Sequence, residues 1–169
     1  MRAPTALALC AALALVLCGV RAGAQDATLV TGGRTPRSGI HALAAGFTPD
    51  PFHVPLSVGG TVAADGLRLG AGCRGFLDRQ PDVVIDWTGR TTFLRFFVRG
   101  SGGDLTLLVN DASGRWHCND DTAPGTDLRP MVDVYSPAPG QYDVWIGTHV
   151  SGARASAELF VTELRTERP

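Results

Sequence analysis

Oxygen-bearing side chains gather in one stretch of the sequence, residues 104–127. Six of them are candidate ligands of a cation: Asp104, Asp111, Asn119, Asp120, Asp121 and Asp127. Calcium takes six to eight oxygen ligands, mainly carboxylates and carbonyls on flexible segments. The stretch therefore predicts a calcium site, with an affinity in the weak extracellular range of about 10⁻⁴ to 10⁻³ M. In the alternative interpretation, these side chains cap turns and face water, because Asx residues bond local backbone and the spacing is not that of an EF-hand.

The elements that position these groups are two strands joined by a tight turn. Residues 105–109 alternate between two faces, residues 110–114 supply turn chemistry, and Trp116 and Cys118 resume the alternation. If the two strands pair, Asp104 at the start of the hairpin lies near Asp120 and Asp121 at its end. Trp116 and His117, next to this acidic end, are candidate ligand contacts.

The cysteines predict a disulfide. Cys10 and Cys18 lie in an N-terminal leader, so the mature chain keeps Cys73 and Cys118. An even pair in an exported protein favours a bond, with a stabilisation of about 4 kcal/mol for a loop of this length. The alternatives are metal ligation and a catalytic thiol. His117 is a poor partner for such a thiol, because neighbouring residues of a strand point to opposite faces.

The leader is the most specific signal in the sequence. Arg2 is followed by an apolar run from Ala6 to Val20 and by the small residues 22–24, which predicts a signal peptide over residues 1–24 and cleavage before Gln25. A membrane span needs about 20 apolar residues, and the run is shorter. Lipoprotein processing at Cys18 is the minor alternative. We therefore expect an exported chain, periplasmic or secreted, with no transmembrane span after cleavage.

Composition argues against several classes of function. The chain has 15 basic residues, all of them arginine, against 16 acidic ones, for a net charge of −1. A nucleic-acid-binding protein normally shows a basic patch, and none is apparent here. The sequence also contains no dinucleotide-binding or phosphate-binding glycine loop. We expect no nucleic-acid partner.

The strand pattern predicts an all-β fold. Residues 25–46 are polar and lack periodicity, so we expect an irregular N-terminal arm, and the ordered domain is expected over residues 47–169. About eight short strands follow one another with frequent turns, as is typical of an antiparallel β-sandwich of jelly-roll type. Pro55 lies in the first of these strands and indicates an edge position. In the strand over residues 92–99, Leu94, Phe96 and Val98 share one face.

Several short motifs then suggest a family. They are Cys73-Arg74-Gly75-Phe76, Trp116-His117-Cys118-Asn119-Asp120-Asp121 and Gly140-Gln141-Tyr142-Asp143-Val144-Trp145-Ile146-Gly147. With these motifs the chain resembles the bacterial pre-peptidase C-terminal domain-like family of exported β-sandwich modules. In larger proteins such modules accompany secreted peptidases and assist folding, targeting or substrate binding. The resemblance thus implies a binding module, here without a peptidase domain, whose partner is an extracytoplasmic protein or polymer.

A secreted hydrolase resembling a serine peptidase is the second hypothesis. The best available nucleophile for such a hydrolase is Ser101, with a histidine as the base. The residues around Ser101 do not have the order of a serine-peptidase nucleophile loop, and no histidine has a recognisable triad partner in sequence. We therefore expect no catalysis.

Overall fold

The structure is a computed structural model, and it describes residues 28–101 and 103–169. The predicted signal peptide, including Cys18, lies outside the described residues. Within the described part of the chain, no helix is long and apolar enough to cross a membrane.

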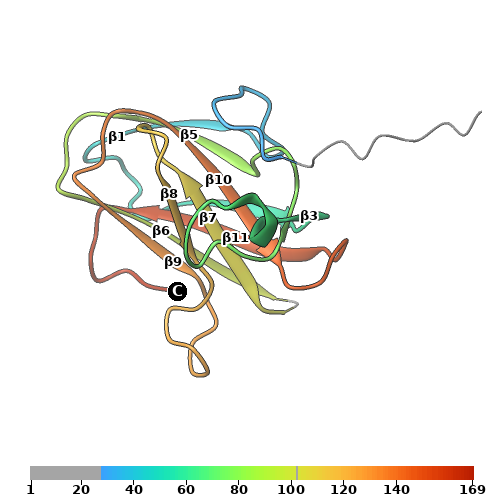
Figure 1. The fold of residues 1–169 in the computed structure, drawn as a ribbon. Helices are drawn as coiled ribbons and strands as arrows, with labels where there is room; N and C mark the ends of the chain where they lie inside the picture. The colour runs from blue at the N-terminus through green and yellow to red at the C-terminus, as the bar shows by residue number, and fades with distance from the viewer. Residues whose placement is uncertain (1–27, 102) are drawn as a thin grey trace, which may run out of the picture.

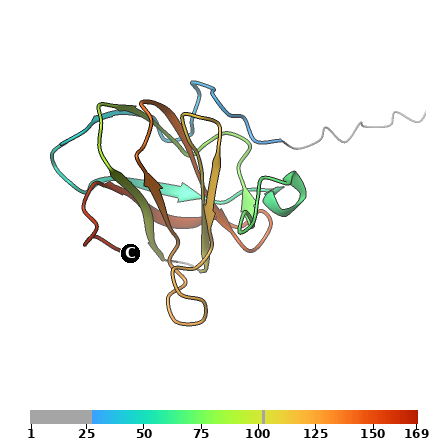
Figure 2. The same ribbon diagram turned by 60° about the vertical axis from the view of Figure 1, so that its left-hand side comes forward.

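Two β-sheets pack face to face (Figures 1 and 2). The first, sheet A, contains β1 (Ile40–Ala44), β5 (Val83–Thr88), β10 (Gly140–Thr148), β4 (Phe76–Leu77), β3 (Val62–Ala63), β7 (Leu105–Asn110) and β8 (Trp116–Asn119). The second, sheet B, contains β2 (Phe52–Val58), β11 (Ala155–Thr162), β6 (Phe93–Ser101) and β9 (Met131–Tyr135) in the order β2-β11-β6-β9. A short 3₁₀ helix, η1 (Ala64–Leu67), follows β3.

The strand order confirms the jelly-roll prediction. In sheet A, β5, β10, β7 and β8 lie next to one another, and the four strands of sheet B supply the other half of the sandwich. Numbered along the chain, these eight strands run 2-7-4-5 in one sheet and 1-8-3-6 in the other, which is the double Greek key of a jelly roll. The described residues form eleven strands rather than about eight, because the short strands β1, β3 and β4 extend sheet A.

The main core lies between the sheets. Leu94, Phe96 and Val98 of β6 point into it, as the alternation predicted, and Phe96 stacks on Tyr142 of β10 with ring centroids 6.0 Å apart. The opposite face of β6 carries Phe97, which stacks on Phe160 of β11 outside the core. Period-two alternation therefore decides which side chains of β6 enter the core between the sheets, although Phe97 on the other face is also buried.

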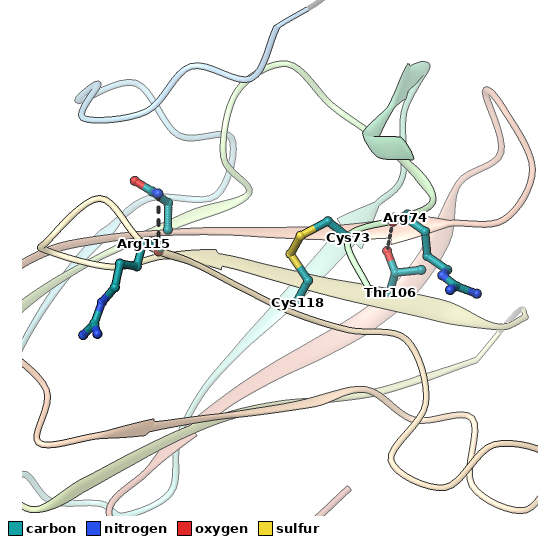
Figure 3. The surroundings of a disulfide bond; sticks show 6 residues. Cys73, Arg74, Thr106, Arg115 and Cys118 are labelled. Carbon is teal, nitrogen blue, oxygen red and sulfur yellow. Dashed lines mark hydrogen bonds between the residues drawn. A yellow bond between two sulfur atoms is a disulfide. The ribbon is translucent and has the colours of Figure 1, made fainter. Parts of the chain in front are cut away.

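A second, smaller cluster lies on the outer face of sheet A. Trp145 of β10 and Leu108 of β7 are fully buried there, together with Leu77 of β4. The predicted disulfide is present at this cluster: Cys73 is bonded to Cys118 with an S–S distance of 2.05 Å (Figure 3). The bond ties the segment that contains β3, η1 and β4 to β8.

The prediction of an irregular arm over residues 25–46 is wrong for Ile40–Ala44. These residues form β1, which pairs in parallel with β5 at the edge of sheet A. Only Leu43 of this strand is buried, so the segment has no alternating pattern from which a strand is predicted. Backbone hydrogen bonds to β5, rather than side-chain burial, hold β1 in place. Residues 28–39 have no regular secondary structure.

Pro55 lies on an edge strand, as expected. β2 pairs with β11 on one side only, and Pro55 stands opposite Glu158 in that pairing. At the other edge of sheet B, Asp133 of β9 lies opposite Arg95 of β6.

Candidate functional site

Three side chains from separate strand ends meet at one end of sheet A. Asp104 precedes β7, Asp120 follows β8, and His149 follows β10. Pairing brings them together, because Thr148 lies opposite Leu105 and Asn119 lies opposite Leu107. His149 Nε2 is 2.8 Å from Asp120 Oδ1 and 3.6 Å from Asp104 Oδ2. One donor atom from each of the three residues lies within 4.8 Å of the other two.

The pKa of Asp104 is raised in this cluster, chiefly by burial. Burial raises the pKa of Asp104, His149 lowers it, and the charges of Asp120 and Asp121 raise it again. Arg74 offers partial compensation, since its Nη1 is 3.4 Å from Asp120 Oδ2. Asp104 Oδ1 and Asp121 Oδ1 are both buried and accept no hydrogen bond.

A hollow of about 290 Å³ opens beside the acidic residues. Its lining includes Gly72, Arg74, Cys118, Asn119, Asp120, Asp121 and Pro124. The cluster is therefore reachable from solvent, on the side where the 121–130 loop projects from the sandwich (Figures 1 and 2).

Asp111 lies apart from this cluster, in the β7–β8 turn. Its carboxylate accepts hydrogen bonds from the backbone N–H groups of Ser113 and Arg115, and His117 Nε2 is 2.8 Å from its Oδ2. Burial by itself raises the pKa of Asp111, but the hydrogen bonds from His117 and Ser113 and from the backbone outweigh it and hold that pKa well below its usual range. Asp111 thus caps the turn, as the alternative interpretation of the acidic side chains expects, in place of binding a cation.

Two more of the predicted ligands are engaged elsewhere. Asn119 donates to the carbonyl oxygen of Asp121 at 3.0 Å and accepts from the backbone N–H of Met131 at 2.9 Å. Asp127 binds the guanidinium of Arg129 through both carboxylate oxygens. Of the six predicted cation ligands, the structure brings Asp104 and Asp120 together, with Asp121 near them, and adds His149, which sequence reasoning missed.

Trp116 lies at the opposite end of β8, on the outer face of sheet A. Its ring is half-buried and packs on Trp145 with centroids 5.3 Å apart. The ring lines a hollow of about 290 Å³. The residues around it are Thr28, Leu29, Thr31, Leu67, Leu69, Asn110, Gly114 and Trp116.

A neighbouring hollow of about 260 Å³ extends this depression. It shares Thr31, Asn110 and Gly114 with the first and adds Gln141 and Asp143 of β10. We refer to the two together as the Trp116 groove. A larger hollow of about 400 Å³ lies elsewhere, lined by residues 90–91 and 136–139, and it contains no aromatic or acidic side chain.

Residues 28–39, which we call the arm from here on, form one wall of the Trp116 groove. Arg34 binds both carboxylate oxygens of Asp86 at 2.6 and 2.7 Å. The backbone N–H of Gly32 donates to Asp143 Oδ2 at 2.7 Å. Arg37 pairs with the buried carboxylate of Asp82 at 3.1 Å. These polar contacts, rather than an apolar pattern, position the arm, which is why the sequence did not indicate a groove here.

The three residue types of a serine triad also occur together, but in the wrong arrangement. Asp111 lies between Ser113, whose hydroxyl donates to it at 2.5 Å, and His117. A triad requires the imidazole to lie between the hydroxyl and the carboxylate. Ser101, the nucleophile of the hydrolase hypothesis, is exposed at the end of β6, and no hydrogen bond joins it to a histidine of the described residues.

Comparison with known proteins gives a distant structural similarity and no sequence-level match. No protein-family model and no curated protein matches the chain. Among solved structures, the chain is similar to PliG of Aeromonas hydrophila, a periplasmic lysozyme inhibitor of g-type lysozyme, with 15% sequence identity and a TM-score of 0.28. The match covers 73% of this chain and 96% of that one. No family follows from it.

Proposed function

We propose that this chain is an exported, non-catalytic binding module that recognises an extracytoplasmic protein or polymer in the Trp116 groove. The observation that carries the proposal is the Trp116 ring itself: an indole that is only half-buried, lines a hollow, and is backed by a second, fully buried indole. Exposed aromatic rings with one packed face are typical anchors of binding surfaces.

The surroundings of Trp116 favour recognition over a purely structural role. Leu29 and Leu69 pack beside the ring, so the floor of the groove is apolar, whereas Asn110 and Gln141 supply amide groups. An apolar floor with a few convergent polar groups is the usual composition of a ligand site. The disulfide at Cys118, two residues along the same strand, limits movement of the ring, which lowers the entropy lost on binding.

The resemblance to the pre-peptidase C-terminal domain-like family is part of this proposal. Modules of that kind are exported β-sandwiches that assist folding, targeting or substrate binding, and the leader, the disulfide and the jelly-roll order are compatible with membership. Periplasmic or extracellular residence also belongs to the proposal. It rests on the leader sequence, which lies outside the described residues.

Binding of the exported protein to a panel of insoluble polysaccharides, peptidoglycan and immobilised peptides tests the proposal. We expect at least one member of the panel to retain the protein and Trp116→Ala to weaken that retention at least tenfold. Tyr135→Ala is the matched control, because Tyr135 is an exposed aromatic residue of sheet B, remote from the groove. Its binding is expected to equal that of the wild type.

Two results would contradict the proposal. One is retention that Trp116→Ala leaves unchanged while near-ultraviolet circular dichroism shows a native fold. The other is turnover of a panel substrate that a single substitution abolishes, which would support the hydrolase hypothesis instead.

A further inference from the structure

We propose that Asp104, Asp120 and His149 bind a divalent transition-metal ion, and that zinc fits this set of donors best. The site lies at the end of β8 remote from Trp116, so the inference does not rest on the proposed function. It also changes the class of metal that the sequence predicted.

The donor chemistry distinguishes zinc from calcium. Calcium is bound almost entirely by oxygen, and an imidazole is a poor ligand for it. Zinc accepts both histidine nitrogen and carboxylate oxygen, usually four ligands in a tetrahedron, at about 2.0 to 2.2 Å. His149 supplies the nitrogen in a place where a calcium site would have another oxygen. The position of His149 beside the two carboxylates is not evident from the sequence.

The geometry is close to what zinc requires. Bond lengths of about 2.1 Å place neighbouring ligand atoms of a tetrahedron roughly 3.4 Å apart. His149 Nε2 lies 2.8 Å from Asp120 Oδ1 and 3.6 Å from Asp104 Oδ2, and donors from all three residues fall within 4.8 Å of one another. Bringing these separations to about 3.4 Å takes changes of roughly 0.2 to 1.4 Å, which side-chain rotations supply, and completes three of the four positions. The adjoining hollow leaves the fourth open to water or to Asp121.

Unpartnered carboxylate oxygens give an independent reason for a cation. Asp104 Oδ1 and Asp121 Oδ1 are buried without a hydrogen bond, although buried polar atoms are nearly always paired. Two carboxylates, Asp104 and Asp120, meet here beside His149, and Arg74, which is about half exposed, reaches only Asp120. A bound divalent ion supplies the missing positive charge and a partner for these oxygens.

Metal titration of the chelator-treated exported protein tests the site. We expect one zinc ion per chain, measured by competition with a chromophoric chelator, and a rise in melting temperature. We further expect Co²⁺ to give the intense visible absorption of a tetrahedral complex. Asp104→Asn and His149→Ala should each weaken zinc binding at least tenfold. Asp104→Asn keeps the shape of the side chain, so it reports on binding even if the His149 variant folds poorly.

His53→Ala is the matched control. His53 also pairs with a carboxylate, that of Glu158, but it belongs to no cluster of three ligands. Zinc affinity should be unchanged in this variant. The proposal fails if the wild type binds no zinc, or if all three variants bind it equally. It also fails if calcium raises the melting temperature more than zinc does and His149→Ala leaves the calcium effect intact, which would restore the oxygen-only site.

Discussion

The interior between the two sheets and the outer side of sheet A are built in different ways. Between the sheets, aliphatic and aromatic side chains from regularly alternating strands pack together, as Phe96 does on Tyr142. On the outer side of sheet A, a cover formed by residues 28–39 and by residues 64–75 between β3 and β4 is attached by one disulfide and a set of ion pairs around the small cluster of Trp145. The interior maintains the fold, whereas the cover shapes the groove.

A substitution in the interior should have the largest effect. Phe96→Ala removes a fully buried ring between the sheets, and we expect it to lower the free energy of unfolding by about 3 to 5 kcal/mol. Urea denaturation measures the change. Tyr135→Ala, at an exposed ring, should change it by no more than about 0.5 kcal/mol. Equal free energies of unfolding for the two variants would contradict the view that the interior maintains the fold.

Removal of the disulfide should have the second-largest effect, and it should act mainly on the cover. Cys73→Ala with Cys118→Ala opens a link between residues 45 apart in sequence, and we expect a loss of about 2 to 4 kcal/mol. Hydrogen exchange should show the earliest loss of protection in β3, β4 and β8, with β6 and β11 still protected. Equal and simultaneous loss in both groups of strands would show that the cover and the interior unfold as one unit.

The pH dependence of stability should report on Asp82, where the arm meets sheet A. Burial raises the pKa of Asp82 to about 7, against the hydrogen bond from the Ile146 N–H and the charge of Arg37. Because the folded state then holds the proton more tightly than the unfolded state, stability from this group is greatest below about pH 4. It is lost as the pH rises through about 7.

Between pH 5 and pH 8 the contribution of Asp82 to the free energy of unfolding falls by roughly 3 kcal/mol, because about two pKa units at about 1.36 kcal/mol each lie in this range. Asp82→Asn keeps the acceptor for Ile146 and should flatten this slope. Denaturation curves across the range test the prediction, and an unchanged slope in the variant would assign the dependence to other groups.

The smallest effect is expected at the surface of the arm. Arg34→Ala breaks the paired hydrogen bonds to Asp86, but both side chains are substantially exposed, so we expect only a small decrease in the free energy of unfolding. High salt should reduce the difference from the wild type. A decrease as large as that of the disulfide variant would show that residues 28–39 contribute to the stability of the whole sandwich.

Sequence reasoning succeeded where side chains alternate. The inward set of Leu94, Phe96 and Val98, the edge position of Pro55 and the disulfide all followed from residue type and spacing. It missed β1 because a strand held by backbone pairing, with Leu43 alone buried, leaves no periodic signal.

The site was predicted in part for a similar reason. Asp104 and Asp120 belong to one hairpin, so their proximity follows from local pairing. His149 is 29 residues beyond Asp120 and joins them only through the register of β10 on β7, which a single sequence does not specify. Asp111 and Asp127 were indistinguishable from ligands by residue type alone, since Asx side chains serve turns and cations equally well.

The edges of sheet B bear on how copies of this chain behave when crowded together. An unpaired strand edge is a template for another chain, and added strands lead to aggregation. At the β2 edge, Pro55 lacks the N–H that an incoming strand needs, and at the β9 edge Asp133 places a carboxylate in a strand of only five residues. Neither edge offers an uninterrupted apolar strand, so sheet B resists growth into polymers of its own kind.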